Sequence, residues 1–482
     1  MIMKFKNKIF ASSLLLLVAI GGVSCKKYLD VNANPLSSLK VEPKLLFGYA
    51  VTAWDVSKNS GDNYLAVGFV GQTFSSGGDF SGNWGSSNLY NMSSNVLTNN
   101  WRGYYANTGL NLKTAIKLAE ENKDPNTAAQ CKIILAQVMY ETTTLYGDIP
   151  FSQAFKIDEF PYPKYDSQKD VLEGLIAMLD EATAQMNSAN PLKISDYDIF
   201  YKGNLDQWKK YANSLKLKIL MLMVDKDPSK AAAIGTLVSN PAGLISTAAD
   251  NCRILYSETP NNENPKYRLF LGDDPLTYAG KVSTDIMIPK KDPRLSRYFD
   301  KPAGETEFIG VEANVDADKH TSTLGSYLLR KAAPSLIISA QEMLFLQAEA
   351  YARGLGVTKN LATAQGLYKD AVIAAMTFYE VPQASIDTYV ADNLVNLTTA
   401  ADPVKEIHIE QWIDLIDRPA EAFVQWRRSG PDGTEVPKLT LPKDATPGPL
   451  FRRFVLPQEE LGANINIPQP TAVYSDKMWF DL

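Results

Sequence analysis

Apolar side chains recur at helical spacing over much of the chain. The spacing alternates between three and four residues, which places them on one face of an amphipathic helix. Three runs show the pattern best: Leu112, Ala115, Ile116 and Ala119; Trp208, Ala212, Leu215, Ile219 and Leu222; and Leu344, Ala348, Tyr351 and Leu355. Because the pattern returns in distant segments, it predicts a mainly α fold.

One stretch, residues 343–376, resembles a tetratricopeptide helix pair. Ala364, Tyr368 and Ala371 are spaced like the small and aromatic residues of the second helix of that repeat, and Gly354 and Gly356 mark the turn. One such pair cannot bury its apolar face alone. Residues 106–146 and 168–226 match the repeat more weakly. We therefore expect tetratricopeptide-like helix pairs that form a scaffold.

Long irregular segments interrupt the helical pattern. Residues 57–100 are rich in Gly, Ser and Asn, with aromatic residues dispersed among them, and residues 256–310 and 430–482 are rich in Pro. Such composition favours loops and short turns over long helices. We expect long loop-rich excursions inserted into the scaffold, where binding residues are often found.

The N-terminus has the pattern of an export signal. Lys4, Lys6 and Lys8 precede an apolar run at residues 9–20, and small residues lead to Cys25. This pattern predicts a signal peptide at 1–24, a lipidated tether at 25–45 that begins with Cys25, and a single helical domain at 46–482. The alternative is a soluble exported protein with an incidental cysteine.

Composition narrows the possible functions. The 482 residues carry 48 basic and 54 acidic side chains, a net charge of −6, which argues against a nucleic-acid partner. Only His320 and His408 could supply imidazole, which leaves little room for a zinc site or a His-based catalytic triad. We expect no metal and no cofactor. Cys131 and Cys252 could form a disulfide after export, or remain buried thiols.

No pattern indicates a catalytic site. The sequence HIEQW around His408 lacks the zinc-protease arrangement, and neither a GxSxG elbow nor a P-loop is present. We therefore predict a binding protein that is not an enzyme. Two alternatives stay open: an exported glycoside hydrolase with a carboxylate pair, and a helical-repeat scaffold that binds only proteins.

Several short motifs occur in a fixed order along the chain. They are the run Lys26-Lys27-Tyr28-Leu29-Asp30 after Cys25, Trp101 with Tyr104 and Tyr105, Tyr146-Gly147-Asp148-Ile149-Pro150, Trp208 with Ala212-Asn213-Ser214-Leu215-Lys216-Leu217-Lys218, Asp292-Pro293-Arg294-Leu295, Ala348-Glu349-Ala350, Gln411-Trp412, and Trp426-Arg427-Arg428-Ser429-Gly430-Pro431. Together they resemble the SusD/RagB family of nutrient-binding outer-membrane lipoproteins of Bacteroidota, in its SusD-like subgroup.

The resemblance implies a location, a partner and a ligand class. The protein would be anchored in the cell outer membrane through lipid on Cys25 and would face the surface. It would capture an oligosaccharide or peptide nutrient and pass it to a TonB-dependent SusC-like transporter. In such lipoproteins, export to the cell surface is often linked to acidic residues just after the cysteine, but here Lys26 and Lys27 occupy those positions. Which leaflet of the outer membrane carries the protein is therefore left open.

Aromatic residues in polar loops are the candidates for ligand binding. Sugar rings present apolar faces that pack on flat side chains, while amides and charged groups meet the hydroxyls. The candidates are Phe80, Trp84, Tyr90, Tyr267, Arg268 and Tyr278. The alternative is that these rings only anchor the loops to the body.

The motif residues themselves are expected to be structural. Trp208 would lie in the core while the lysines of its motif point into solvent. Arg427 and Arg428 would lie at a helix end, where cations are favoured, or would contact the transporter.

Overall fold

The computed structural model describes residues 41–77, 84, 87, 90–271, 277–443, 445 and 448–482. All the elements below belong to one compact unit, Pro43–Leu482. The helices of its first half are α2 (Pro43–Lys58), the π-helix η1 (Gly61–Leu65), α3 (Ala66–Val70), α4 (Ser94–Arg102), the π-helix η3 (Gly103–Gly109), α5 (Leu110–Glu121), α6 (Pro125–Tyr146), α7 (Gln168–Gln185) and α8 (Leu205–Met223).

Helices also dominate the second half. They are η4 (Pro228–Lys230), α9 (Ala231–Val238), η5 (Pro241–Gly243), α10 (Pro265–Leu269), α11 (Lys281–Met287), α12 (Leu295–Tyr298), α13 (Ala340–Arg353), α14 (Leu361–Phe378), α15 (Gln383–Asp392), α16 (Pro403–Asp414), α17 (Pro419–Arg427) and α18 (Gln458–Ala463). The expected mainly α fold is confirmed.

The strands are short and play a minor part. Within the described residues, β1 (Phe74–Ser75), β5 (Tyr278–Ala279), β7 (Thr323–Leu324) and β6 (Phe299–Asp300) form an antiparallel sheet in that order. Two further antiparallel pairs join β2 (Ile149–Pro150) to β3 (Tyr165–Asp166) and β4 (Cys252–Ile254) to β8 (Ser335–Ile338). They fasten loop segments to the helical scaffold.

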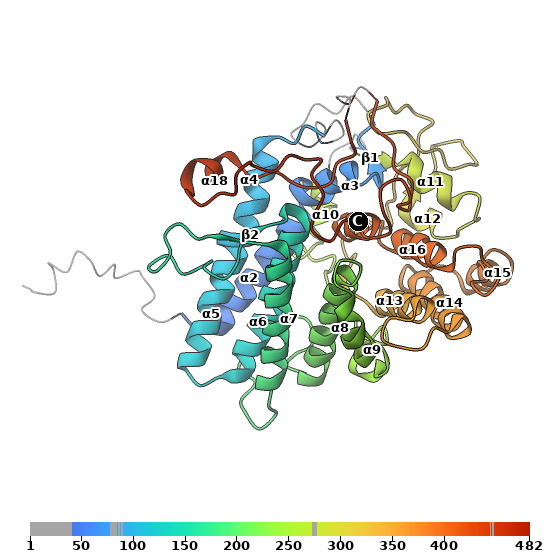
Figure 1. Ribbon diagram of the computed structural model, residues 1–482. Coiled ribbons are helices and arrows are strands. Elements are labelled where there is room, and N and C mark those ends of the chain that lie inside the picture. The colour runs from blue at the N-terminus through green and yellow to red at the C-terminus, as the bar shows by residue number, and fades with distance from the viewer. Residues whose placement is uncertain are drawn as a thin grey trace, which may run out of the picture. The chain divides into compact units, whose positions relative to one another are not determined.

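The helices pack as antiparallel neighbours, as the periodicity predicts. Helix α5 packs on α6, α6 on α7 and α7 on α8, and the α13–α14 pair lies on the other side of α8 (Figure 1). The left-handed backbone of Gly354 (φ +77°) ends α13, a conformation that costs glycine little. Helix pairs are therefore confirmed at 106–146, 168–226 and 343–376.

Two apolar clusters hold the described residues together. The larger one runs from α2 to the C-terminal segment and includes fully buried Trp208. The smaller one joins α13 to α14 through Phe345, Ala348 and Tyr368. Cys131 and Cys252 are both buried free thiols, which decides between the two alternatives that the sequence left open. No described helix combines the length and hydrophobicity needed to cross a bilayer.

The two motif arginines and one motif lysine are buried, although the lysine was expected to point into solvent. Lys218 forms ion pairs with Glu342 at 2.8 Å and Glu421 at 2.9 Å. Arg428 pairs with Glu349 at 2.8 Å. These cations can be buried because carboxylates from distant helices neutralise them. The expectation of solvated lysines is therefore wrong for Lys218.

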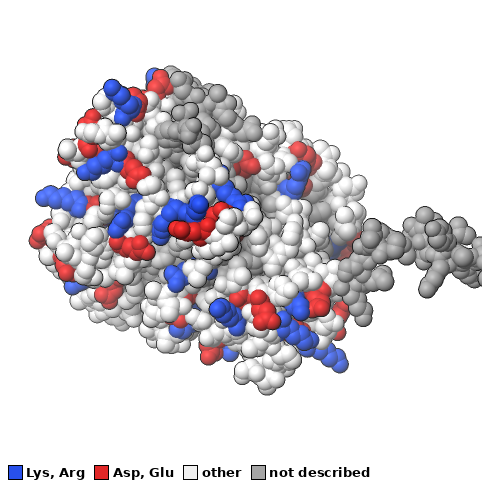
Figure 2. Space-filling view, turned by 180° about the vertical axis from the view of Figure 1, so that it is seen from behind, with Lys and Arg blue, Asp and Glu red and all other residues white. Residues whose placement is uncertain are grey.

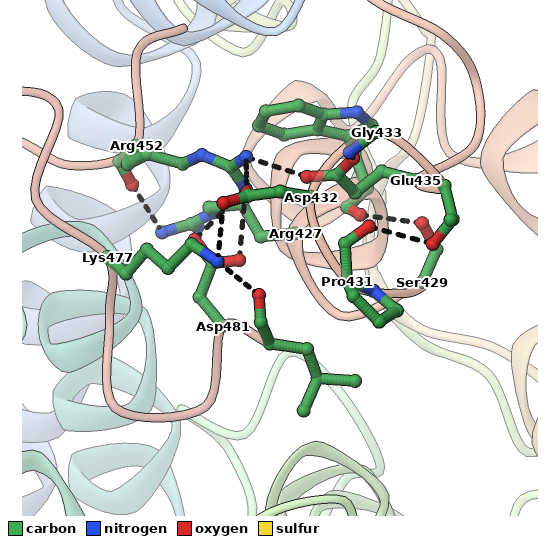
Figure 3. A network of polar contacts seen from close by, with 12 residues as sticks. Arg427, Ser429, Pro431, Asp432, Gly433, Glu435, Arg452, Lys477 and Asp481 are labelled. Atoms are coloured by element: carbon green, nitrogen blue, oxygen red, sulfur yellow. Dashed lines mark hydrogen bonds and ion pairs between the residues drawn. The ribbon is translucent and has the colours of Figure 1, made fainter. Parts of the chain in front are cut away.

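The arginine motif at the end of α17 anchors the C-terminal segment (Figure 3). Arg427 is fully buried and donates to the carbonyl oxygens of Thr144 and Arg452, at 2.7 and 2.9 Å. Arg452 in turn pairs with Glu435 and Asp481. Arg427 is the last residue of α17, so it does lie at a helix end as expected. Because it is fully buried against groups of the same chain, it is not in a position to contact a partner.

We expect the Glu349 network to make stability depend on pH. Glu349 is fully buried and contacts Arg353, Arg428 and His408, and the nearby cations hold its pKa well below 4.5. A depressed carboxylate pKa stabilises the fold above the unfolded-state pKa, and this contribution is lost as the pH falls. Glu349→Gln should therefore lower the free energy of unfolding by about 3–5 kcal/mol at neutral pH.

The measurement is urea unfolding of both proteins across a pH series. The difference between them should shrink as the pH falls below about 4.5, because Glu349 then binds a proton in the unfolded chain while the folded carboxylate, with its lowered pKa, stays ionised. A difference that stays constant down to strongly acidic pH would contradict the assignment.

On the surface, positively and negatively charged side chains are interspersed, as the face in Figure 2 shows.

Candidate ligand-binding groove

A groove of 510 Å³ opens where the end of α2 meets η1 and α10. Trp84 and the loop after β4 complete its walls. The lining residues are Thr52, Val56, Asn59, Ser60, Gly61, Asp62, Trp84, Tyr256, Asn261, Asn262, Glu263, Pro265, Arg268 and Leu269. Its volume lies within the range of about 300–1,000 Å³ typical of small-ligand sites. The lining combines aromatic and aliphatic surface with amides and a few charges.

The Trp84 ring is held in this groove through its edge and through one face. Its Nε1 donates to Oδ1 of Asp62 at 2.7 Å, and Oδ2 of Asp62 accepts from Asn99 at 2.8 Å. The ring lies so close to Gly61 that a Cβ there would stand 2.2 Å from Trp84 Cε2. Both Gly61 and Asp62 belong to the π-helical turn η1, a type of element often found at functional sites.

The opposite wall is a set of tied polar groups. The Tyr256 hydroxyl donates to buried Asp55, and burial together with this carboxylate raises the pKa of Tyr256. Arg268 Nη2 donates to Glu263 Oε2 at 2.9 Å and to Asn261 Oδ1 at 3.1 Å. The hydrogen bond from Arg268 lowers the pKa of Glu263. These contacts fix the direction of the polar groups before any ligand arrives.

Two of the predicted site residues meet in this groove. Trp84 and Arg268 come from segments far apart in the sequence, yet both line it. Tyr267, next to Arg268 on α10, lies under the ammonium of Lys331, 5.4 Å from its ring centre. Tyr267 is not among the lining residues.

The other predicted residues lie elsewhere or outside the described residues. Tyr90 is 7% exposed and packs against Phe451 and Tyr474, with ring centres 5.6 and 5.9 Å away. Its surroundings match the alternative in which the ring anchors a loop. Tyr278 forms part of strand β5. Phe80 and Cys25 lie outside the described residues.

The sequence reasoning missed three groups that shape the groove. Asp62 lies in the same Gly- and Asn-rich stretch as Trp84, so the composition of that stretch could have pointed to it as a groove residue. Glu263 lies beside the asparagines that had drawn attention to Arg268. No local signal pointed to Tyr256, because its role depends on α2, which is distant in sequence.

The chemistry of the lining suits recognition. Asp62 already accepts hydrogen bonds from two side chains, and Glu263 forms an ion pair. A general acid in glycoside hydrolysis needs a raised pKa, whereas that of Glu263 is lowered. Across the described part of the chain, no group of three or more His, Cys, Asp or Glu side chains is arranged to hold a metal ion.

Gly61→Ala should displace Trp84 without unfolding the protein. The new methyl group would overlap the indole, so the ring would have to leave the groove. The emission of the seven tryptophans would change only by the contribution of Trp84, and the melting temperature should fall by a few degrees at most. Ligand binding should weaken about as much as in Trp84→Ala. Gly366→Ala, where a Cβ meets nothing within 4 Å, is the matched control.

A family model described as "Starch-binding associating with outer membrane" (SusD-like) matches residues 57–457. The chain belongs to the SusD-like family. It is thus a nutrient-binding protein of a family associated with the outer membrane. A comparison with curated proteins found no match.

Solved structures share the fold over almost the whole chain. A chitin-binding protein is 25% identical, with a TM-score of 0.77, over 92% of this chain and all of that one. A SusD/RagB family protein from Bacteroides thetaiotaomicron is 21% identical, with a TM-score of 0.79, over 92% and 99% of the two chains. A chitin-binding SusD homologue from Flavobacterium johnsoniae is 20% identical, with a TM-score of 0.74, over 91% and 97%.

Proposed function

We propose that this SusD-like protein captures an oligosaccharide in the Trp84 groove and passes it to a TonB-dependent SusC-like transporter. It would be held in the outer membrane by lipid on Cys25, with the groove on the cell surface. The observation that carries the proposal is an aromatic ring fixed in a groove among oriented amides and carboxylates. Tryptophan offers a flat apolar surface for a sugar ring, and the polar groups meet its hydroxyls.

The composition of the lining favours a saccharide over a peptide. Asn261 and Asn262 are exposed in the groove wall, and amides both donate to and accept from hydroxyl groups. A peptide backbone usually binds by adding a strand to a sheet edge or as a helix in an apolar groove. The groove walls are helices and loops, and more than half of the described lining residues have polar or charged side chains. Chitin-type saccharides enter the test panel because two similar structures are of chitin-binding proteins.

We also propose that the groove performs no chemistry on its ligand. Its two carboxylates are held by Trp84, Asn99 and Arg268, and the ion pair keeps Glu263 ionised. An ionised, paired carboxylate cannot act as the general acid of glycoside hydrolysis. Capture and release then depend only on contacts with the ligand.

The test is a binding screen of the mature chain carrying Cys25→Ser. Neutral oligosaccharides, acidic oligosaccharides and short peptides are titrated by calorimetry, and each bound ligand is then examined by mass spectrometry. An intact saccharide supports the receptor. Cleavage products would overturn the non-catalytic reading, and binding of peptides alone would overturn the saccharide assignment.

The transfer to a transporter needs a separate experiment. The lipidated protein is expressed in a bacterium that encodes it and is purified from detergent-solubilised outer membranes through a C-terminal tag. We expect a TonB-dependent transporter to co-purify in near-equal amount. Its absence, or recovery of the tagged protein from the soluble fraction, would contradict the proposed partner or the anchor.

A further inference from the structure

The groove is lined by more acidic than basic side chains. Among its described lining residues, Asp62 and Glu263 are acidic and Arg268 is the one cation. Glu263 lies 2.9 Å from the Arg268 guanidinium, so the positive charge is already balanced within the wall. Within the described part of the chain, the Asp62 carboxylate accepts hydrogen bonds from Trp84 and Asn99 and forms no ion pair. The described lining therefore presents an excess of negative charge.

The Arg268–Glu263 pair is arranged so that the acid is the more shielded partner. The Arg268 side chain is 49% exposed and that of Glu263 is 11% exposed. Arg268 donates to Asn261 and Glu263 through Nη2, which leaves further guanidinium N–H groups to donate to a ligand. A neutral hydroxyl can accept from these groups. A ligand carboxylate would instead have to compete with Glu263 for the guanidinium and would be repelled by Asp62.

We propose that the groove selects uncharged saccharides and that Glu263 determines this selectivity. Glu263 neutralises Arg268 while leaving it as a hydrogen-bond donor, so acidic sugars such as uronates gain no ionic contact. This inference rests on the proposed function, because it takes the groove to be the saccharide site. It adds the class of saccharide and names the residue that excludes the other class.

Glu263→Gln tests the inference because it removes one charge and keeps the shape of the side chain. The ion pair is partly exposed and contributes little to stability, so the variant should fold normally. Glu258→Gln is the matched control: this glutamate is exposed in the same loop and is not a lining residue. Neutral malto-, cello- and N-acetylchito-oligosaccharides are compared with oligogalacturonates of the same length by calorimetry.

We expect the wild-type protein to bind a neutral oligosaccharide and to bind the oligogalacturonates at least about tenfold more weakly. Glu263→Gln should gain about tenfold in affinity for the acidic ligand, because Arg268 is then free to form a charge-assisted hydrogen bond. Adding Arg268→Gln should remove that gain. Glu258→Gln should behave like the wild-type protein.

The possible failures are distinguishable. If the wild-type protein prefers the oligogalacturonate, the saccharide receptor stands and the inference about charge is wrong. If it binds neutral sugars but Glu263→Gln gains nothing for the acidic ones, Glu263 does not determine selectivity. If no saccharide of either class binds, the proposed function fails and the inference falls with it.

Discussion

Trp84→Ala should weaken saccharide binding by at least about tenfold while leaving the fold intact. The substitution removes the indole from the groove and with it the flat surface on which a sugar ring packs. Buried aromatic anchors commonly contribute about 2 kcal/mol or more to binding, which is more than a tenfold change in affinity. The measurement is calorimetric titration with the tightest oligosaccharide from the screen, together with thermal unfolding.

Two further variants separate the ring from its hydrogen bond. Trp84→Phe keeps an aromatic surface but cannot donate to Asp62, so we expect an intermediate loss of affinity. Tyr162→Ala removes an aromatic ring that is 50% exposed and lies outside the groove lining, so its affinity should equal that of the wild-type protein. Wild-type affinity in Trp84→Ala, measured on folded protein, would contradict the placement of the site.

Arg294→Met should lower the free energy of unfolding by about 3–5 kcal/mol. The guanidinium is fully buried and lies 2.5 Å from both Asp292 and Glu410. It helps to lower the pKa of Glu410 to about 2, against the opposing effect of burial. Without this cation, two buried carboxylates would face each other with less compensation. Urea unfolding at neutral pH measures the loss.

A double variant shows whether lost charge compensation is the cause. Arg294→Met combined with Glu410→Gln removes one of the stranded carboxylates, so part of the lost stability should return. Lys319→Met removes an exposed cation and should change stability by no more than about 0.5 kcal/mol. Glu410→Gln alone is the reference. If this substitution lowers the stability of Arg294→Met by as much as it lowers that of the wild-type protein, the loss in Arg294→Met comes from packing of the arginine and not from charge.

The helical scaffold could be predicted because its signal is local. The spacing of Trp208, Ala212 and Leu215 places them on the buried face of α8, whatever lies opposite. The same argument holds for Ala364, Tyr368 and Ala371 in α14. The end of a helix could also be predicted where a glycine adopts the left-handed conformation, as Gly354 does after α13.

The polar interior could not be predicted in the same way. Lys218 and Arg427 have the side chains expected of surface residues, yet both are buried, and nearly all of α17 is buried with Arg427. Their burial depends on Glu342 and Glu421 for Lys218, and on the carbonyl oxygen of Thr144 for Arg427. Such partners lie on other elements, so no window of sequence contains both sides of the contact.

The sequence by itself determined the helical class, the paired helices and the family motifs. Each of these depends on neighbours within one or two helical turns or on the order of short motifs. Only the tertiary structure decided that Trp84 and Arg268 share one groove whereas Tyr90 packs in an aromatic cluster. The physical reason is that burial of the common core brings together segments that are distant in sequence, and these segments form the groove. The pattern within one segment does not indicate which other segments will lie beside it.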